Sequence, residues 1–463
     1  MYSRHSLEDT IVALATAPGL AAIAVIRISG DQAFEIVEEC FEGRSIQDLD
    51  SHTVHLGYIR SAEEQVIDQV LITLFKGPHS YTGENTIEIS CHGSSYIQSA
   101  IIDRLVALGA RPAGRGEFTF RAFYHGKLDM TQAEGVADLI AAESKAEATV
   151  ALHHLKGGIS AEIAALRDQL VHFASMLELE LDFGEEEVEF ADRQQLTQLL
   201  DTANARIQIL LDSFKLGNAI KQGITTVIAG RPNAGKSTLL NALLQEERAI
   251  VSEIPGTTRD TIEEVLHIEG IPFRLVDTAG IREAKDQIEA IGVSRTHEKI
   301  RQSSILLYVF DVTEMRPAEV EADIYRLMHA DLEVILVPNK MDLNPYTLPE
   351  DYIMPGITRA DIIPTSAKNQ MNIIYLKERI LQTIHSDHAL LAQNIVSNSR
   401  HVDSLVKVQE HLARARTQVT NLSGHELIAM DIRQALHYLG EITGEVTTDE
   451  LLESIFGRFC IGK

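Results

Sequence analysis

The spacing of apolar residues changes along the chain, and each change indicates a different kind of structure. In residues 1–122, short apolar runs are separated by turn residues such as Pro18-Gly19 and Gly77-Pro78. Strands are predicted over residues 10–15, 21–28 and 70–75, and helices over residues 34–41 and 97–108. We therefore expect an α+β domain at this end of the chain.

From residue 129 the apolar residues recur at three- and four-residue spacing, which is typical of amphipathic helices. Helices are predicted over residues 132–154, 159–181, 399–439 and 449–456. Their apolar faces need partners. The economical arrangement is one discontinuous helical domain, residues 123–217 and 385–463, with another domain inserted in it. Two separate small bundles are the alternative.

An α/β domain is predicted for the intervening residues, 218–384, with strands over residues 224–228, 272–276 and 334–337. The first strand leads into Gly230–Ser237, G-R-P-N-A-G-K-S, and a helix follows over residues 238–244. Strand, glycine loop and helix N-terminus in this order form a phosphate cradle, because backbone N–H groups and the helix dipole face the anion. Lys236 can reach the terminal phosphates, and the Ser237 hydroxyl can ligate magnesium.

Three further motifs follow strands of the same domain: Asp277–Gly280 (D-T-A-G), Asn339–Asp342 (N-K-M-D) and Ser366–Lys368 (S-A-K). Asp277 can hold magnesium through water, and the Gly280 amide can contact a γ-phosphate. Asp342 can accept hydrogen bonds from N1 and the exocyclic amine of guanine, a donor pair that adenine lacks. The four motifs together predict a GTP-binding domain.

The sequence also limits how GTP hydrolysis can work. Many small GTPases carry a water-orienting glutamine directly after D-T-A-G, but this chain has Ile281 there. Glu289 is the nearest candidate for that role, with Glu283 and Asp286 as alternatives. The charge that develops between the β- and γ-phosphates needs a cation. The candidates are Arg259, Arg282 and a monovalent ion ligated by the Asn233 amide oxygen, although Asn233 also suits a turn-stabilising Asx role.

Composition narrows the class of protein. A length of 463 residues predicts about three domains. The net charge of −26 argues against indiscriminate nucleic-acid binding, which depends on basic surfaces. No apolar run is long enough for a bilayer, and three cysteines, Cys40, Cys91 and Cys460, argue for a reducing compartment. A cytoplasmic protein without a membrane partner is expected.

Two local features favour a structural interpretation. Arg104, Arg111, Arg115, Arg121 and Lys127 form the one basic-rich segment, which we interpret as a solvated face, as we do the acidic segment around Glu185–Glu187. Cys91-His92 has no second pair at metal-ligand spacing and is interpreted as a strand end.

The chain resembles the MnmE (also TrmE) family of bacterial GTPases that modify tRNA wobble uridines. Besides the GTPase motifs, the resemblance is carried by Ala24–Gly30, Ser80–Glu84, Gly114–Phe118, Lys127–Asp129, Gln132–Glu134 and the closing pentapeptide Phe459–Lys463, F-C-I-G-K. It covers the whole chain. It implies a tetrahydrofolate-binding and dimerising domain over residues 1–122, the discontinuous helical domain, and an inserted Ras-like domain over residues 218–384.

The resemblance also implies roles for individual residues. The positions that match nucleotide contacts are Asn233, Ala234, Gly235, Lys236, Ser237, Thr238, Ser252, Glu253, Ile254, Pro255, Gly256, Thr257, Thr258, Asp277, Thr278, Ala279, Gly280, Asn339, Lys340, Asp342, Ser366, Ala367 and Lys368. Potassium would be held by Asn233, Ser252, Ile254 and Thr257, and magnesium by Ser237 and Thr258. Glu289 would act through water on the γ-phosphate.

For the folate, the resemblance implies contacts from Arg27, Glu88, Lys127 and Lys463 to 5-formyltetrahydrofolate or 5,10-methylenetetrahydrofolate. Cationic groups suit the glutamate carboxylates of a folate, and a carboxylate suits the donors of its pterin ring. Cys460 is either a nucleophile beside the one-carbon unit or a chemically inert thiol.

The expected function is installation of a carboxymethylaminomethyl or aminomethyl group at C5 of the wobble uridine of certain tRNAs. The expected partners are a second copy of the chain, tRNA and the flavoprotein MnmG, which supplies FAD within a heterotetramer. A GTPase switch in ribosome assembly is the alternative, but such proteins usually carry a second GTPase domain or a KH module, and only one P-loop is present. A third reading treats the N-terminal domain as an independent folate enzyme that the GTPase regulates.

Overall fold

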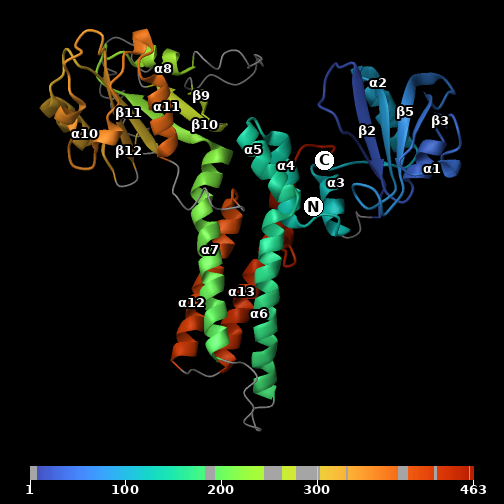
Figure 1. Cartoon of the computed structure of the whole chain (residues 1–463). Coiled ribbons are helices and arrows are strands. Elements are labelled where there is room, and N and C mark those ends of the chain that lie inside the picture. The colour runs from blue at the N-terminus through green and yellow to red at the C-terminus, as the bar shows by residue number, and fades with distance from the viewer. Residues whose placement is uncertain are drawn as a thin grey trace, which may run out of the picture. The chain divides into compact units, whose positions relative to one another are not determined.

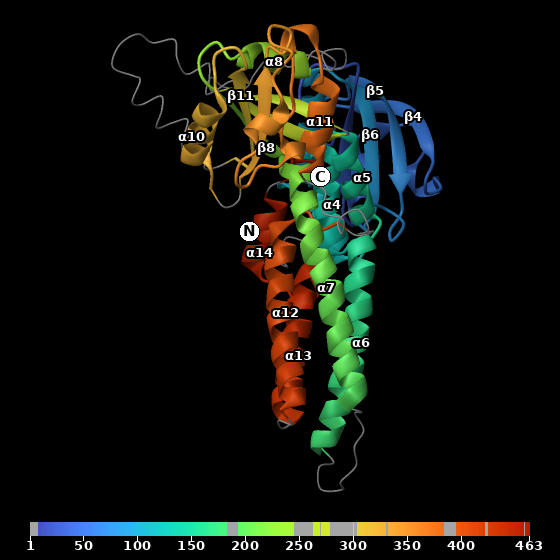
Figure 2. The ribbon, with the colours of Figure 1, turned by 60° about the vertical axis from the view of Figure 1, so that its left-hand side comes forward.

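A computed structural model describes residues 8–182, 193–244, 263–268, 270–277, 300, 303–329, 332–383, 395–421, 425–457 and 459–463. The chain divides into two compact units (Figures 1 and 2). The first comprises Met1–Ile140, Leu152–Leu196 and Glu410–Lys463, and the second comprises Ala141–Ala151 and Thr197–Gln409. Each unit is therefore assembled from segments that are far apart in the sequence.

The first unit contains a seven-stranded sheet with the strand order β3-β4-β5-β6-β2-β1-β7. Its strands are β1 (Ile11–Leu14), β2 (Ile23–Ser29), β3 (Phe41–Glu42), β4 (Val54–Arg60), β5 (Val66–Phe75), β6 (Thr86–His92) and β7 (Arg111–Pro112). Helices α1 (Ala33–Glu38) and α2 (Ser95–Ala107) pack on one face, over a core that includes Ile26, Ile72 and Ile89. The predicted strands and helices of this α+β domain are confirmed, apart from end residues.

The opposite face of this sheet is covered only in part. Near β1, Phe118 of helix α3 (Glu117–Tyr124) packs with Ile11 and Ala13. Farther along, strands β2, β4 and β5 leave large apolar side chains exposed, namely Ile23, Val54, Leu56 and Leu71. Because side chains alternate across a strand, Arg27 of β2 lies on this face, while its neighbours Ile26 and Ile28 are buried in the core.

The predicted helix over residues 132–154 is wrong as a single element. Helix α4 (Met130–Ala141) ends before α5 (Lys145–Leu155) begins. Ser144 explains the break, because its Oγ accepts a hydrogen bond from the Glu147 N–H at 3.2 Å and donates to Glu147 Oε1 at 2.9 Å. This S-x-x-E capping arrangement starts a new helix.

Longer helices lie before and after the predicted GTP-binding domain in the sequence. They are α6 (Gly158–Asp182), α7 (Arg193–Gln222), α12 (Ser399–Thr420), α13 (His425–Thr443) and α14 (Asp449–Phe456). Within the first unit, α6 packs along α13 and α14 packs against α3. The predicted helix over residues 399–439 is thus two helices. The boundaries of the predicted domains stay predictions, and α7 continues to Gln222, beyond the expected boundary at residue 218.

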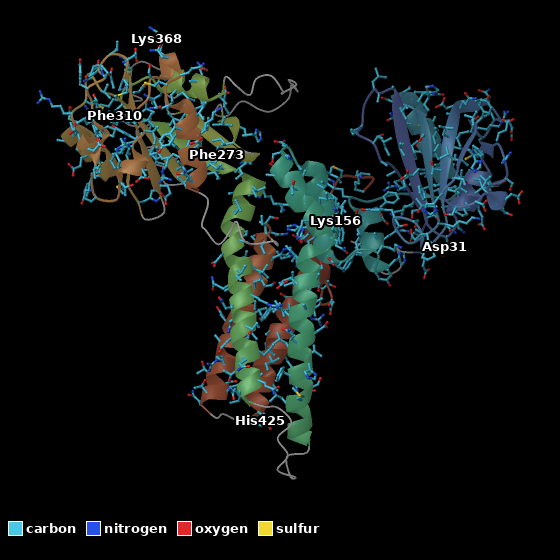
Figure 3. The ribbon with its side chains drawn as sticks, in the orientation of Figure 1. Asp31, Lys156, Phe273, Phe310, Lys368 and His425 are labelled. Carbon is cyan, nitrogen blue, oxygen red and sulfur yellow. The ribbon has the colours of Figure 1, made fainter. Side chains whose placement is uncertain are left out.

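The second unit contains a five-stranded sheet with the order β12-β11-β8-β10-β9. Its strands are β8 (Ile224–Ala229), β9 (Glu263–Ile268), β10 (Ile271–Asp277), β11 (Ile305–Asp311) and β12 (Glu333–Asn339), and only the β9–β10 pair is antiparallel. Helices α8 (Lys236–Leu244) and α11 (Ile373–Gln382) pack on one face and α10 (Pro317–Leu327) on the other. Phe273 and Phe310, labelled in Figure 3, belong to the cores on these two faces. The predicted α/β domain is confirmed.

No helix within the described part of the chain is both long and apolar enough to span a bilayer.

Candidate functional site

The glycine loop of the second unit lies at the carboxyl end of β8 and ends where α8 begins at Lys236. Lys236 is buried, and its Nζ donates to the carbonyl oxygens of Gly230 at 3.0 Å and Arg231 at 2.9 Å. Gly230 has φ +151°, and a Cβ there would overlap the Val309 carbonyl oxygen. The loop thus requires glycine at this position, and its first two carbonyl groups hold the lysine against it.

Asn339, at the end of β12, joins the glycine loop to the S-A-K segment. Its Nδ2 donates to the Ala234 carbonyl oxygen at 2.8 Å, and its Oδ1 accepts from the Ala367 N–H at 3.0 Å. The side chain is buried, and a Cβ on Gly235 would collide with its amide nitrogen. Three motifs that are distant in sequence are therefore held together by one amide group.

The remaining residues of the N-K-M-D motif point to two different partners. Asp342 Oδ1 accepts a hydrogen bond from Ser366 Oγ at 2.7 Å, while Lys340 Nζ donates to Asp311 Oδ2 at 2.6 Å. Burial raises the pKa of Asp311, but hydrogen bonds from Lys340 and Thr313 outweigh it and lower that pKa overall. Asp342 is exposed, so its carboxylate can accept further hydrogen bonds from a ligand.

Arg231, inside the glycine loop, is anchored to α10. Its Nε donates to Asp323 Oδ2 and its Nη1 to Glu319 Oε1, both at 3.0 Å. Asp323 Oδ2 also accepts from the Tyr308 hydroxyl of β11 at 2.6 Å. The hydrogen bonds to Asp323 and Glu319 raise the pKa of Arg231, and the guanidinium fastens the start of the loop to the helix.

In the first unit, Arg27 and Glu88 face each other directly across β2 and β6. The Nε and Nη2 atoms of Arg27 both donate to Glu88 Oε1, at 3.0 and 2.6 Å. Two aromatic rings cover the guanidinium, with their centroids 5.2 Å (Tyr81) and 5.6 Å (Phe118) from Arg27 Cζ. The two predicted folate contacts are thus in direct contact with each other.

Lys127 and Lys463 reach the surroundings of this pair by different routes. Lys127 Nζ donates to the Pro78 carbonyl oxygen at 2.9 Å, in the segment that continues to Tyr81. The Lys463 carbonyl oxygen accepts from the Phe118 N–H at 3.2 Å. Both lysines therefore contact segments that carry a ring over Arg27.

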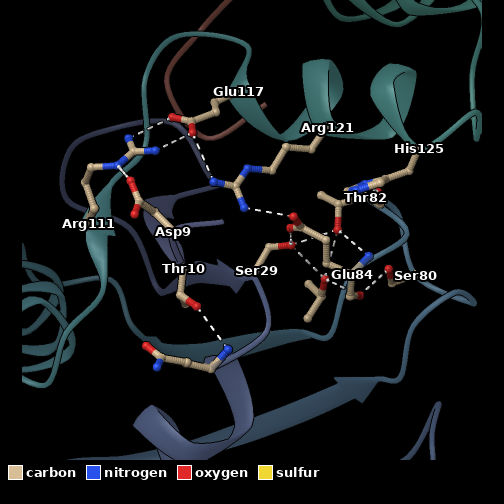
Figure 4. Close-up of polar contacts among 12 residues, drawn as sticks. Asp9, Thr10, Ser29, Ser80, Thr82, Glu84, Arg111, Glu117, Arg121 and His125 are labelled. Atoms are coloured by element: carbon tan, nitrogen blue, oxygen red, sulfur yellow. Dashed lines mark hydrogen bonds and ion pairs between the residues drawn. The ribbon is translucent and has the colours of Figure 1, made fainter. Parts of the chain in front are cut away.

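Beside this pair lies a network of buried charges, drawn in Figure 4. Arg121 is completely buried, and its guanidinium contacts Glu84 Oε1 at 2.9 Å and Glu117 Oε1 at 3.3 Å. Glu117 also receives a hydrogen bond from Arg111 Nη2 at 2.7 Å, and Glu84 receives one from Ser29 Oγ at 2.7 Å. The expectation of a solvated basic face is therefore wrong for Arg121, because it is neutralised inside the domain by carboxylates.

Two family models match consecutive parts of the chain. The family model described as "GTP-binding protein TrmE N-terminus" matches residues 10–127, and "MnmE helical domain" matches residues 130–460. A protein named tRNA modification GTPase MnmE from Cytophaga hutchinsonii is 50% identical over 98% of this chain and 98% of its own. The chain belongs to the MnmE family.

A second MnmE relative, from Flavobacterium psychrophilum and of the same name, is 50% identical over 98% of this chain and 99% of its own. Among solved structures, one of Aquifex aeolicus Era bound to GDP.AlF4- is 27% identical, with a TM-score of 0.28, over 41% of this chain and 66% of that one. The assignment to the MnmE family rests on the two family models and on the sequence relatives.

Several residues that match MnmE motifs lie outside the described residues. These are Ser252, Glu253, Ile254, Pro255, Gly256, Thr257, Thr258, Thr278, Ala279, Gly280 and Glu289, together with the alternatives Arg259, Arg282, Glu283 and Asp286. Asp277 is described as the last residue of β10. Ser237, Thr238 and Lys368 are exposed beside the cradle, and Asn233 is exposed with φ +62°.

The cysteines of this MnmE chain differ in exposure. Burial raises the pKa of Cys40 and of Cys91 to about 11, so both thiols stay protonated near neutral pH. Cys91-His92 ends strand β6, as predicted, and no cluster of metal-ligating side chains exists among the described residues. Cys460 is exposed.

Sequence reasoning missed the anchoring contacts of Arg231 and Lys340. A signal for the second existed, because Asp311 ends a fully buried strand in the same way as Asn339 does. For Arg231, the partners Glu319 and Asp323 lie 88 and 92 residues later, and nothing in local spacing connects them.

Proposed function

We propose that the chain is a GTP-hydrolysing enzyme that acts in tRNA modification. The observation that supports the proposal is the pair of hydrogen bonds made by Asn339, which hold the glycine loop and the S-A-K segment together at the end of β12. Membership in the MnmE family, whose relatives are named tRNA modification GTPases, supports the second part of the proposal.

Guanine selectivity would come from Asp342. Its Oδ1 accepts from Ser366, and its Oδ2 has no partner among the residues that the structure describes. A carboxylate held in this way accepts the paired donors of guanine and rejects adenine, whose edge offers a different pattern. The Ala367 amide, fixed by Asn339, lies in the adjoining segment.

The described residues also fit the two cations that the family resemblance implies. Ser237 and Asn233 are exposed, and their side chains make no hydrogen bond within the described chain. An Asn233 amide without such a bond supports the cation role over the Asx-turn role. Ser237 with Thr258 would hold magnesium, and Asn233 with Ser252, Ile254 and Thr257 would hold potassium. Bound there, cations offset negative charge on the phosphates.

Hydrolysis also needs an oriented water molecule. Ile281 follows D-T-A-G and cannot form a hydrogen bond to water. We assign the role to Glu289, which would act on the γ-phosphate through water. Replacing it with alanine should spare GTP affinity and abolish turnover, and unchanged turnover would transfer the role to another residue.

A reduced folate is the ligand proposed for the Arg27–Glu88 pair. Arg27 Nη1 and Glu88 Oε2 have no partner within the described residues, and the two side chains are 14% and 28% exposed. The pair thus offers donors and an acceptor side by side, which suits a pterin ring. Lys127 and Lys463 would add positive charge for the carboxylates of 5-formyltetrahydrofolate or 5,10-methylenetetrahydrofolate, and Cys460 would lie on the same tail as Lys463.

The proposed reaction adds a carboxymethylaminomethyl or aminomethyl group at C5 of a wobble uridine, together with MnmG, which brings FAD. The chain is proposed to act as a homodimer. The exposed apolar side chains of Ile23, Val54, Leu56 and Leu71 on one sheet face support self-association, because exposed apolar patches of this kind mark interfaces.

The test combines GTP turnover with mass spectrometry of tRNA. Purified chain should hydrolyse GTP, and cells that lack the chain should accumulate tRNA with unmodified wobble uridine. Wild-type chain should restore the modification, whereas Lys236→Ala should fail. Normal tRNA in the deletion strain, with abnormal ribosomal subunits, would contradict the proposal and favour a ribosome-assembly GTPase.

A further inference from the structure

The guanidinium of Arg27 is immobilised more completely than a surface ion pair requires. Glu88 holds one edge through two hydrogen bonds to a single oxygen, and the rings of Tyr81 and Phe118 lie within 5.6 Å of Arg27 Cζ. Neither ring carries a charge that would pair with a folate carboxylate. Their contact is with the arginine itself.

We propose that Tyr81 and Phe118 are positioning residues for Arg27, and that docking of the C-terminal tail, Phe459–Lys463, keeps Phe118 in place. The proposal rests on the proposed folate site and deepens it, since it states which residues position the arginine of that site. Arginine loses much rotamer freedom when it binds a ligand, and aromatic faces that hold it beforehand reduce that loss.

Tyr81 is fixed from its far end. Its hydroxyl and the Thr119 Oγ1 are 2.9 Å apart, and its ring packs against the buried cluster of Ile11, Ala13, Ala113 and Phe118. The ring therefore cannot leave Arg27 without breaking this hydrogen bond or exposing the cluster. Thr119 belongs to α3, the same helix as Phe118.

Phe118 is fixed through its backbone by the C-terminal tail. Its N–H donates to the Lys463 carbonyl oxygen at 3.2 Å, and the Gly116 N–H donates to the Cys460 carbonyl oxygen at 3.3 Å. Arg115 and Ile461 form an isolated antiparallel bridge next to these two contacts. The tail therefore satisfies backbone donors at the start of α3, which a helix cannot satisfy itself.

The tail can follow this path only with glycine at position 462. Gly462 has φ +96°, and a Cβ there would overlap the Leu14 carbonyl oxygen of β1. A side chain at this position must displace the tail from β1 or from α3. Position 462 thus connects tail docking to the ring above Arg27 without altering any side chain assigned to the folate.

The first experiment measures affinity for 5-formyltetrahydrofolate by calorimetry on the full-length chain. Tyr81→Leu and Phe118→Leu should each weaken binding about 5- to 30-fold. Tyr81→Phe loses the hydrogen bond to Thr119 but keeps the ring and its packing in the apolar cluster, so its loss should be smaller, within about threefold of wild type. In an Arg27→Ala background, Phe118→Leu should cost less than about twofold, because no guanidinium remains to be positioned. Equal losses in both backgrounds would overturn the proposal.

The second experiment tests tail docking by comparing substitutions at two glycines that both have a positive φ. Gly462→Ala should weaken folate binding. Part of this loss should vanish in the Arg27→Ala background, and the rest should remain because the displaced tail also carries Lys463. Gly109→Ala is the matched control, because Gly109 has φ +116° but open space around its Cβ position. Equal effects of the two glycine substitutions would show that backbone strain, and not tail docking, explains the loss.

A third arm needs no folate. Phenylglyoxal reacts with guanidinium groups, and mass spectrometry of peptides gives the rate at Arg27 alone. Tyr81→Leu and Phe118→Leu should raise that rate about threefold or more, whereas Tyr96→Leu, at a tyrosine that is 78% exposed on α2, should leave it unchanged. If the wild-type chain does not bind folate, the proposed folate site is wrong. An unchanged labelling rate at Arg27 in Tyr81→Leu and Phe118→Leu would separately overturn the proposal that these two rings position Arg27.

Discussion

Asn339 and Ala234 are joined by a hydrogen bond of 2.8 Å, from the side-chain amide at the end of β12 to a carbonyl group of the glycine loop. Asn339→Asp replaces this buried donor with an acceptor, so that two oxygens face each other. We expect GTP affinity to fall about tenfold or more, since a buried carbonyl group loses its partner. Titration with a fluorescent GTP analogue measures the loss.

Asn372→Asp is the control for that substitution. The Asn372 amide also donates to a backbone carbonyl group, that of Pro364 at 2.7 Å, but its side chain is exposed. Water can replace the lost donor there, and GTP affinity should stay within about twofold of wild type. If both variants bind GTP as wild type does, Asn339 does not organise the cradle.

Asp342→Asn should change which base the chain accepts. The carboxylate accepts from guanine, whereas the amide can donate to the C2 oxygen of xanthine. We expect weaker GTP binding, improved XTP binding and a reversal of preference by about 100-fold or more, because each unpaired polar contact is costly. Competition between GTP and XTP measures this, and Asp351→Asn, at an exposed residue of the same unit, is the control. An unaltered preference would remove Asp342 from the base site.

Potassium should accelerate GTP hydrolysis by at least about tenfold over sodium, because a cation between the phosphates takes the place of an arginine finger. Asn233→Gly is the informative variant. Asn233 has φ +62°, which glycine adopts without strain, so the substitution removes the amide and keeps the loop. This variant should hydrolyse GTP equally slowly in both salts. A variant that still responds to potassium would contradict the assignment.

The GTP-binding motifs could be predicted because each one follows its own strand, and strand ends are visible in local sequence. Helix α8 begins at Lys236, two residues before its predicted start, and β12 ends at Asn339, two residues after its predicted end. The contact between Asn339 and Ala234 spans 105 residues and could not be predicted, because no local spacing encodes it. The same limit applies to the contact of Arg27 with Glu88, which lies 61 residues later on a strand of which only the end, Cys91-His92, had been predicted.

Two errors had signals that were available in the sequence. The break before α5 has an S-x-x-E pattern at Ser144 and Glu147, and this capping box outweighs the continuous apolar spacing. Glu117 and Arg121 are four residues apart, a spacing that pairs opposite charges on a helix. Burial of that pair depends on Glu84, which only the folded sheet brings to it.

Glu117 should make the first unit sensitive to acid. Burial raises the pKa of Glu117, but hydrogen bonds from Arg111 and the Gly114 N–H, with the charges of Arg111 and Arg121, bring it below its usual 4.5. A depressed pKa stabilises the fold above pH 4.5, and this contribution is lost as the pH falls through the folded-state value. Glu117→Gln should therefore lower the free energy of unfolding by about 3 kcal/mol at pH 7, since Arg121 loses a buried partner.

The pH series distinguishes this charge effect from a packing defect. The difference in urea unfolding between wild type and Glu117→Gln should narrow as the pH falls from 4.5 to the folded-state pKa, because Glu117 of the unfolded wild type then takes up a proton that the native carboxylate does not. Glu42→Gln is the control, since Glu42 pairs with Arg60 on the same sheet with a half-exposed side chain, and water screens that pair. A difference for Glu117→Gln that stays constant as the pH falls from 7 through the folded-state pKa would mean that shape, and not the carboxylate charge, stabilises the network around Arg121.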